Sequence, residues 1–142
     1  MKPFLFNEPL LPEGFRFPSE YEALINSTSW PDLQPWSFLA ADKALSLSFY
    51  SEMLIKFPAS PLIPFACIND QSGFYNDGWI VLACFEVNQL TAQPTVRIYN
   101  GGTPNKTPWE NFSYDSFIEW LYVAKEESVR FKAEKAEIDS ED

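Results

Sequence analysis

The feature that most constrains the fold is a run of seven apolar residues at 79–85, Trp-Ile-Val-Leu-Ala-Cys-Phe. Successive side chains of a β-strand point to opposite faces of the sheet, so a strand with one wet face alternates between apolar and polar residues. In this run both alternating sets are apolar. We therefore predict a central strand that is covered on both sides, with Trp79 in the core.

Two more strands are predicted around this one. Residues 62–68 form a short apolar run bounded by turn residues, and the prolines near it exclude a helix. Pro64 fits best at the beginning of that strand, because proline cannot donate to a sheet ladder. Residues 95–99 alternate, which predicts a strand with Val96 and Ile98 inward and Arg97 outward.

Helical patterns lie before and after the strands. Ser19 followed by Glu22 has the sequence of a capping box and predicts a first helix. Apolar residues at helical spacing across 36–57 predict a second, amphipathic helix that starts near Asp42. A third helix is predicted to begin after Ser113, to bury Phe117 and Trp120, and to continue through 125–135.

Because helices and strands are segregated along the chain, the predicted fold class is α+β. We expect a single antiparallel β-sheet flanked by N-terminal helices and a C-terminal helix. The 142 residues suit one domain. We predict an extended N-terminal arm at 1–18, one α+β domain at 19–135 and a disordered acidic tail at 136–142.

The first residues do not have the pattern of a signal peptide, because Glu8 and two prolines interrupt a short apolar stretch. No apolar run approaches the roughly 18 residues needed to span a bilayer. We therefore expect a cytoplasmic protein that does not bind membranes.

The formal net charge is −10, of which residues 125–142 contribute −3 and residues 1–124 contribute −7. Most of the negative charge is thus expected on the folded body. Such a body repels nucleic acid and attracts basic proteins. This charge favours a basic protein partner over direct nucleic-acid binding, although acidity also serves solubility.

The sequence contains no histidine. Ser–His and Cys–His nucleophile pairs are therefore excluded, as are histidine-bearing zinc and non-haem iron sites. The two cysteines, Cys67 and Cys84, are too few for a four-cysteine metal site. We expect them to be buried, reduced thiols rather than a disulfide or a reactive pair, and we expect no catalytic residue, metal or cofactor.

Several segments together resemble the SUKH superfamily, which has the Smi/Knr-type fold and is common among bacterial toxin-immunity proteins. The residues that carry the resemblance are 62–66, 80–85, 96–99 and 116–121, with a polar loop after the first segment. The resemblance implies an antiparallel sheet with helices packed against it. It also implies a non-catalytic role, in which the protein binds and neutralises a toxin domain, often a nuclease or deaminase. The sequence departs from the family pattern at Phe74 and Tyr75, which replace small residues.

Aromatic residues beside acidic residues are typical of protein-binding hot spots. The loop 70–78 and the loop 101–112 both carry such pairs, and we expect them to face the partner together. The alternative is that these rings fold back and anchor their own loops. The predicted partner-binding residues are Asp70, Phe74, Tyr75, Asp77, Glu86, Trp109 and Glu110.

The function predicted from the sequence is a non-catalytic protein-binding module, specifically an immunity protein that neutralises a nuclease- or deaminase-type toxin in the cytoplasm. One alternative is a housekeeping regulatory or scaffold protein of the same fold. Another is a small enzyme that uses a buried carboxylate, which a pocket holding a carboxylate with a raised pKa would support.

Overall fold

The structure, a computed structural model, describes residues 11–12, 15–70, 72–86 and 93–140. Its elements in chain order are α1 (Ser19–Ile25), β1 (Trp36–Phe38), the 3₁₀ helix η1 (Leu39–Ala41), α2 (Lys43–Lys56), β2 (Leu62–Ile68), the 3₁₀ helix η2 (Asn76–Gly78), β3 (Val81–Glu86), β4 (Thr95–Asn100) and α3 (Phe117–Ser140). The strands form one antiparallel sheet in the order β1-β2-β3-β4. The predicted α+β fold, with one antiparallel sheet flanked by N-terminal helices and a C-terminal helix, is confirmed.

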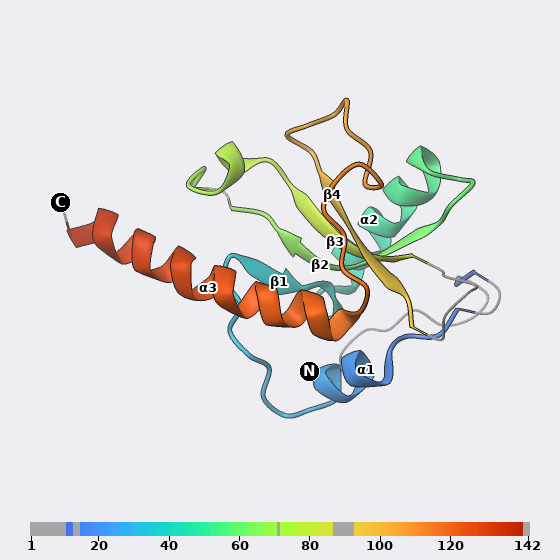
Figure 1. The fold of residues 1–142 in the computed structure, drawn as a ribbon, viewed down its shortest axis with the longest axis horizontal. Coiled ribbons are helices and arrows are strands. Elements are labelled where there is room, and N and C mark those ends of the chain that lie inside the picture. The colour runs from blue at the N-terminus through green and yellow to red at the C-terminus, as the bar shows by residue number, and fades with distance from the viewer. Residues whose placement is uncertain (1–10, 13–14, 71, 87–92, 141–142) are drawn as a thin grey trace.

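Helices cover both faces of the sheet (Figure 1). The helices α1 and α3 pack on one face and α2 packs on the other. This arrangement explains why residues 81–85 of β3 are all buried, as the doubly apolar run predicted. The N-terminal half of α3 lies over the sheet, and its C-terminal half extends beyond it.

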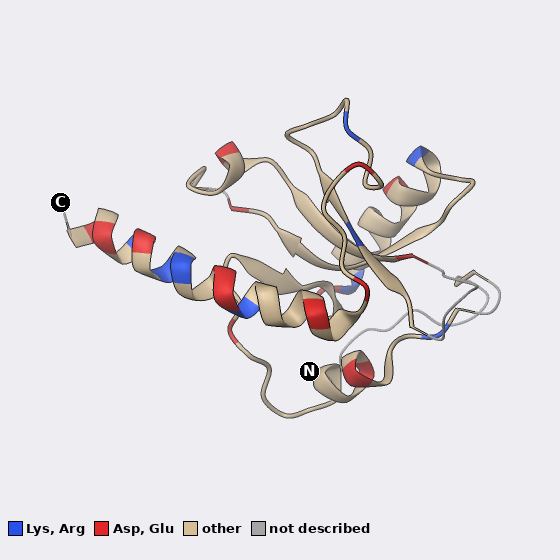
Figure 2. Ribbon diagram, viewed as in Figure 1, with Lys and Arg blue, Asp and Glu red and all other residues tan. Residues whose placement is uncertain are grey.

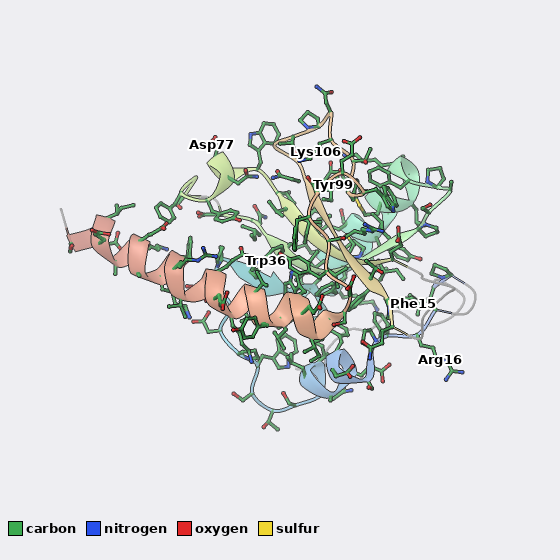
Figure 3. All side chains as sticks on the ribbon, in the orientation of Figure 1. Phe15, Arg16, Trp36, Asp77, Tyr99 and Lys106 are labelled. Atoms are coloured by element: carbon green, nitrogen blue, oxygen red, sulfur yellow. The ribbon has the colours of Figure 1, made fainter. Side chains whose placement is uncertain are left out.

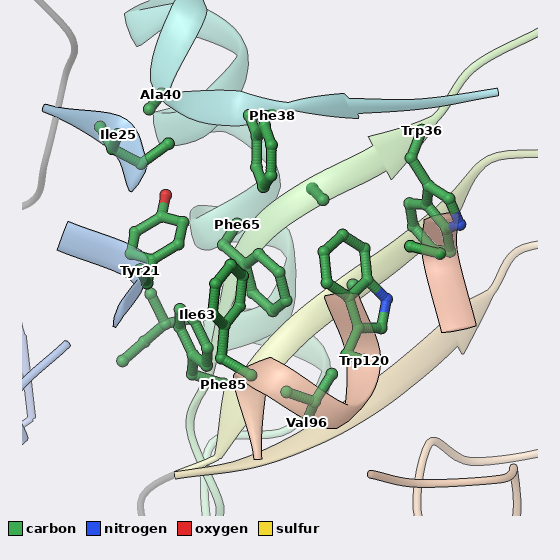
Figure 4. Close-up of a cluster of buried hydrophobic side chains, with 14 of the residues drawn as sticks. Tyr21, Ile25, Trp36, Phe38, Ala40, Ile63, Phe65, Phe85, Val96 and Trp120 are labelled. Atoms are coloured by element: carbon green, nitrogen blue, oxygen red, sulfur yellow. The ribbon is translucent and has the colours of Figure 1, made fainter. Parts of the chain in front are cut away.

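The core beneath α1 and α3 is built largely of aromatic rings (Figure 4). Phe65 of β2 and Phe85 of β3 stack with ring centroids 4.1 Å apart. Trp120 of α3 meets the ring of Phe65 edge-on at 4.9 Å, and Tyr21 of α1 meets Phe85 at 5.2 Å. Edge-to-face pairs at these distances are favourable beyond the area they bury, so they fix both helices on the sheet.

The opposite core lies between the sheet and α2. Asp42 caps α2 by accepting a hydrogen bond from the Leu45 amide at 3.0 Å, so the helix begins where the sequence indicated. Cys67 and Cys84 are both buried in this core as free thiols, as predicted. Burial raises the pKa of Cys67 to about 11 and raises the pKa of Cys84 further, so neither thiol is an activated nucleophile.

A β-bulge interrupts the pairing of β2 with β3. Pro64 pairs with Cys84 and Ala66 pairs with Ala83, so Phe65 is the extra residue on β2. Pro64 was predicted at the beginning of this strand, but it is the third residue of β2. The bulge breaks the regular ladder beside the one residue that lacks an amide hydrogen.

The residues before Asp42, which share the apolar spacing of the predicted second helix, form strand and 3₁₀ helix instead. Trp36 and Phe38 are buried with Ser37 exposed between them, and the three residues pair with the end of β2. A strand of three residues contains too few alternations to distinguish it from a helix by pattern. The predicted capping box is also wrong, because Pro18 occupies the N-cap position and no side chain caps α1.

Two further predictions are corrected by the structure. Trp79 is 56% exposed rather than in the core, because β3 begins only at Val81, after the η2 turn. The helix α3 continues to Ser140, so residues 136–140 of the expected disordered tail are helical. Of the predicted N-terminal arm, residues 1–10 and 13–14 lie outside the described residues, whereas Phe15 is buried in the aromatic core.

Candidate functional site

The loop between β2 and β3 is organised by one carboxylate. The side chain of Asp70 accepts hydrogen bonds from the Ser72 amide at 3.0 Å, the Ser72 hydroxyl at 2.6 Å and the Tyr75 amide at 2.9 Å. These bonds, led by the one from the Ser72 hydroxyl, lower the pKa of Asp70. Asp70, a predicted partner-binding residue, therefore holds the shape of the loop.

The two aromatic residues of this loop point back toward the protein. Phe74 meets Phe131 of α3 edge-on, with ring centroids 5.4 Å apart. Tyr75 is half-buried against the aromatic core. Both rings thus act as anchors between the loop and the body, which was the alternative considered from the sequence. Their partner-binding role stays a prediction.

The tip of the loop turns through two residues with left-handed backbones. Asn76 and Asp77 have φ angles of 53° and 55°, a conformation that costs non-glycine residues free energy. The Asn76 side chain donates to Asn100 Oδ1 at 2.8 Å and ties the turn to the end of β4. Asp77 lies exposed at the outer end of the loop (Figure 3). Asp77 is therefore accessible to a partner, as is Glu110, the other exposed residue of the predicted set.

The remaining predicted site residues form a separate network. Glu86 makes a salt bridge with Arg97 at 3.2 Å and accepts a hydrogen bond from the Trp109 indole nitrogen. Trp109 also packs edge-on against Phe57, with centroids 5.3 Å apart. Glu110 accepts a hydrogen bond from the Thr107 amide at 3.1 Å and closes a turn.

These two groups of predicted residues lie apart. Glu86 is at the opposite end of β3 from loop 70–78, which at about 3.3 Å per residue is a separation of roughly 16 Å along the strand. Tyr75 packs on the α3 side of the sheet, whereas Trp109 packs on the α2 side. The structure therefore does not bring the seven residues into one surface.

A pocket of about 320 Å³ opens between α3, the starts of β3 and η2, the end of β4 and the segment 111–114. We call it the Glu127 pocket. It is lined by Trp36, Tyr75, Asn76, Val81, Ile98, Asn100, Asn111, Phe112, Tyr114 and Glu127. Tyr75 and Asn76 come from the loop whose residues the sequence singled out; the other lining residues were not predicted.

The segment 111–114 forms a wall of this pocket because it pairs with the edge of β4. The amides of Val96 and Tyr114 each donate to the carbonyl of the other residue, at 2.8 Å and 3.0 Å. The Asn111 side-chain amide donates to the Ile98 carbonyl at 2.7 Å. Phe112, which lies between these fixed points, is 75% exposed. The pocket therefore has an exposed aromatic residue at its mouth.

The electrostatics of the pocket are set by Glu127 of α3. Partial burial raises the pKa of this carboxyl above its ordinary value, although the Trp36 indole and the charge of Arg130 partly offset the effect. The charge of Glu127 in turn adds to the burial that raises the pKa values of Tyr75 and Tyr114. Glu127 therefore lies within electrostatic reach of both tyrosines.

The Trp36 indole is the least satisfied polar group of the pocket. The residue is only 6% exposed, and its indole nitrogen has no hydrogen-bond partner within the described residues. The Glu127 carboxylate is close enough to interact with the indole but does not complete a hydrogen bond. A buried donor gains free energy from an acceptor, so the indole favours any arrangement that brings the Glu127 carboxylate into hydrogen-bonding geometry.

A second hollow of about 410 Å³ adjoins the pocket along α3. We call it the outer groove. It shares Tyr75, Asn76 and Glu127 with the Glu127 pocket and continues past Phe74, Arg130, Phe131 and Glu134. Figure 2 shows acidic and basic residues interspersed along this helix. Sequence reasoning missed Glu127 because it is one acid among many on a charged helix, and its position over the sheet depends on tertiary packing.

Across the part of the chain that the structure describes, no cluster of three or more cysteine, aspartate or glutamate residues could hold a metal ion. None of the described helices combines the length and apolar character needed to cross a membrane. Comparisons with protein-family models, with curated proteins and with solved structures found no match for this chain.

Proposed function

We propose that this chain is a non-catalytic binding module that recognises a basic protein partner through the Glu127 pocket and the outer groove. The partner proposed from the sequence resemblance is a toxin domain, of the nuclease or deaminase type, that the module neutralises inside the cell that makes it. The observation that carries the binding proposal is the half-buried carboxylate of Glu127 among aromatic side chains, in a chain of net charge −10.

The composition of the pocket supports binding of a positively charged side chain. Aromatic rings and one carboxylate line it, and the flanking groove adds Glu134 on the same helix. Desolvated rings supply affinity at an interface, and surrounding charges accelerate association with an oppositely charged partner. Exposed Asp77 at the tip of the neighbouring loop adds another negative charge to this side of the protein.

A module of this kind needs no chemistry of its own. A toxin that acts on nucleic acid carries cationic residues around its active site, because its substrate is an anion. An acidic module that covers those residues excludes the substrate. The lack of histidine, and the raised pKa values of both buried thiols, fit a module that works by occupation.

The Glu127 pocket also favours one second candidate, a small enzyme that uses this carboxylate as a general acid. A carboxyl group with a raised pKa in a pocket is a recognised mark of an active site. A housekeeping scaffold of the same fold remains a further alternative, which gene neighbourhood distinguishes from an immunity protein.

Co-expression with the products of neighbouring genes tests the proposal. We expect one neighbouring product to be toxic alone, to be tolerated when this chain is co-expressed, and to copurify with it in a complex that high salt weakens. If no neighbouring product is toxic and no basic protein copurifies, the proposed function is wrong.

A further inference from the structure

We propose that the Glu127 pocket is a receptor for the guanidinium group of an arginine side chain. This inference deepens the proposed function, on which it rests for the identity of the partner as a basic protein. Three features of the pocket favour such a ligand, namely its aromatic rings, its hydrogen-bond acceptors and the buried indole N–H of Trp36.

The aromatic lining is suited to a cation. Trp36, Tyr75, Phe112 and Tyr114 come from three separate segments, and all four line the same pocket. A cation close to the faces of several aromatic rings is attracted by their electron density, and this attraction grows when water is excluded. A planar guanidinium group also stacks on such rings, which a lysine ammonium does not do.

The polar lining is rich in acceptors. Asn76 and Asn111 each use the side-chain nitrogen inside the protein, on Asn100 and on the Ile98 carbonyl respectively. The amide oxygens of Asn76 and Asn111 remain as acceptors, and the Glu127 carboxylate adds two more. A guanidinium group carries five N–H donors and no acceptor, so it matches this set better than an anion or a neutral sugar would.

The incomplete contact between Glu127 and Trp36 supports a ligand that fixes the carboxylate. A carboxylate has two oxygens, so it can accept from a guanidinium group with one and from an indole N–H with the other. Bound arginine would thus hold the carboxylate ionised and allow the buried Trp36 nitrogen to find its acceptor. Arginine binding also supplies a counter-ion to the partly buried carboxylate of Glu127.

Arg130 carries a positive charge near Glu127, so a variant without this charge tests the electrostatics of the pocket. Its charge lowers the pKa of Glu127, yet the salt bridges found among the described residues do not include this pair. Arg130 lines the outer groove rather than the Glu127 pocket. We therefore expect it to repel an incoming arginine and to leave the pocket open.

The test uses pentapeptides with one central residue between pairs of glycines, titrated into the full chain. The central residue is arginine, lysine or uncharged citrulline. The readout is the indole N–H resonance of Trp36, identified with the Trp36→Phe variant. We expect the arginine peptide to bind in the millimolar range, as suits a single side chain, and to shift this resonance downfield as the hydrogen bond forms. Citrulline should bind at least about tenfold more weakly, and lysine several-fold more weakly.

Matched variants separate the pocket from the overall charge. Glu127→Gln should weaken arginine binding about tenfold or more. Glu126→Gln removes the same charge from an exposed residue that lines neither hollow, so it should change arginine binding less than about twofold. Arg130→Gln should strengthen binding about two- to threefold. Equal effects of Glu127→Gln and Glu126→Gln, or equal binding of citrulline and arginine, would overturn the proposal.

The outcomes for the pocket and for the proposed function are distinguishable. If the arginine peptide binds as described but no toxic neighbour is found, the receptor stands and the toxin-neutralising role does not. If a cognate toxin binds equally well to Glu127→Gln and to the unaltered protein, the toxin-neutralising role stands and the arginine receptor is wrong.

Discussion

At the scale of single residues, acidic side chains in this protein have distinct tasks. Asp70 holds the shape of loop 70–78, and Glu86 binds the side chains of Arg97 and Trp109. Glu127 lies partly buried in its pocket and forms no salt bridge among those found in the described residues. The first two are bonded within the protein. Burial raises the pKa of Glu127, so a ligand that supplies a counter-ion would stabilise its ionised form.

The raised pKa of Glu127 predicts a pH-dependent effect on stability. Between the ordinary glutamate pKa of about 4.3 and the higher folded value, the folded state binds more protons than the unfolded state. Ionisation of Glu127 therefore lowers the free energy of unfolding as the pH rises through the folded value. Glu127→Gln should melt at a higher temperature than the unaltered protein near neutral pH, and this difference should vanish below about pH 4.

Melting curves of both proteins across this pH range measure the effect, with Glu126→Gln as the control for a charge change on the exposed side of α3. A Glu127→Gln variant that is less stable than the unaltered protein at neutral pH would show that the ionised carboxylate is already well compensated.

A second prediction concerns Glu86. Glu86→Ala removes the acceptor of both Arg97 and Trp109, which are partly buried, so we expect the free energy of unfolding to fall by about 1–3 kcal/mol. Glu110→Ala, in an exposed turn, should cost less than about 1 kcal/mol. Urea unfolding measures both values. If Glu86→Ala abolished partner binding without loss of stability, its predicted partner-binding role would gain support over a structural one.

At the scale of elements, the loop 70–78 and α3 support each other. Phe74 contacts Phe131 on the part of α3 that begins to leave the sheet, and beyond it the described helix is exposed. The strand β4 contributes through its end, where Asn100 accepts hydrogen bonds from Asn76 and from the Gly102 amide. The pocket is therefore formed by contacts between elements that are far apart in sequence.

This support predicts a local change in dynamics. Phe74→Ala should speed amide hydrogen exchange in residues 131–140 of α3, because the ring contact that holds Phe131 is lost. Residues 117–128 should keep their protection, since Phe117, Trp120 and Ala124 pack on the sheet. Exchange followed by mass spectrometry measures both segments, with Phe112→Ala as a matched change at an exposed ring. Unchanged exchange at 131–140 would contradict the anchoring role of Phe74.

At the scale of the whole molecule, the elements that the sequence predicted best are those with long, simple patterns. Residues 81–85 are buried on both faces as the doubly apolar run indicated, and the order of strands follows the chain. The strand at residues 36–38 is not predicted, because three residues carry too little periodicity to distinguish a strand from a helix. The pattern places Trp79 in the core because the residues that follow it are apolar, whereas β3 begins only at Val81 and leaves Trp79 exposed.

The candidate pocket was less predictable than the fold. Loop 70–78 was identified from its aromatic and acidic residues, and it does supply Tyr75 to the pocket. Glu127, Tyr114 and Trp36 could not be grouped from sequence, because only the crossing of α3 over the sheet and the pairing of Tyr114 with Val96 bring their segments together. Such contacts are set by tertiary packing rather than by spacing along the chain.

A titration of the partner's toxic activity with this protein gives the most direct test of a binding role. A module that works by occupation should abolish the activity in proportion to the amount added, with an end point near one molecule of this protein per molecule of toxin. Glu127→Gln should shift the inhibition curve to higher concentrations. Complete inactivation by far less than one equivalent would show turnover, and would contradict a binding role in favour of catalysis.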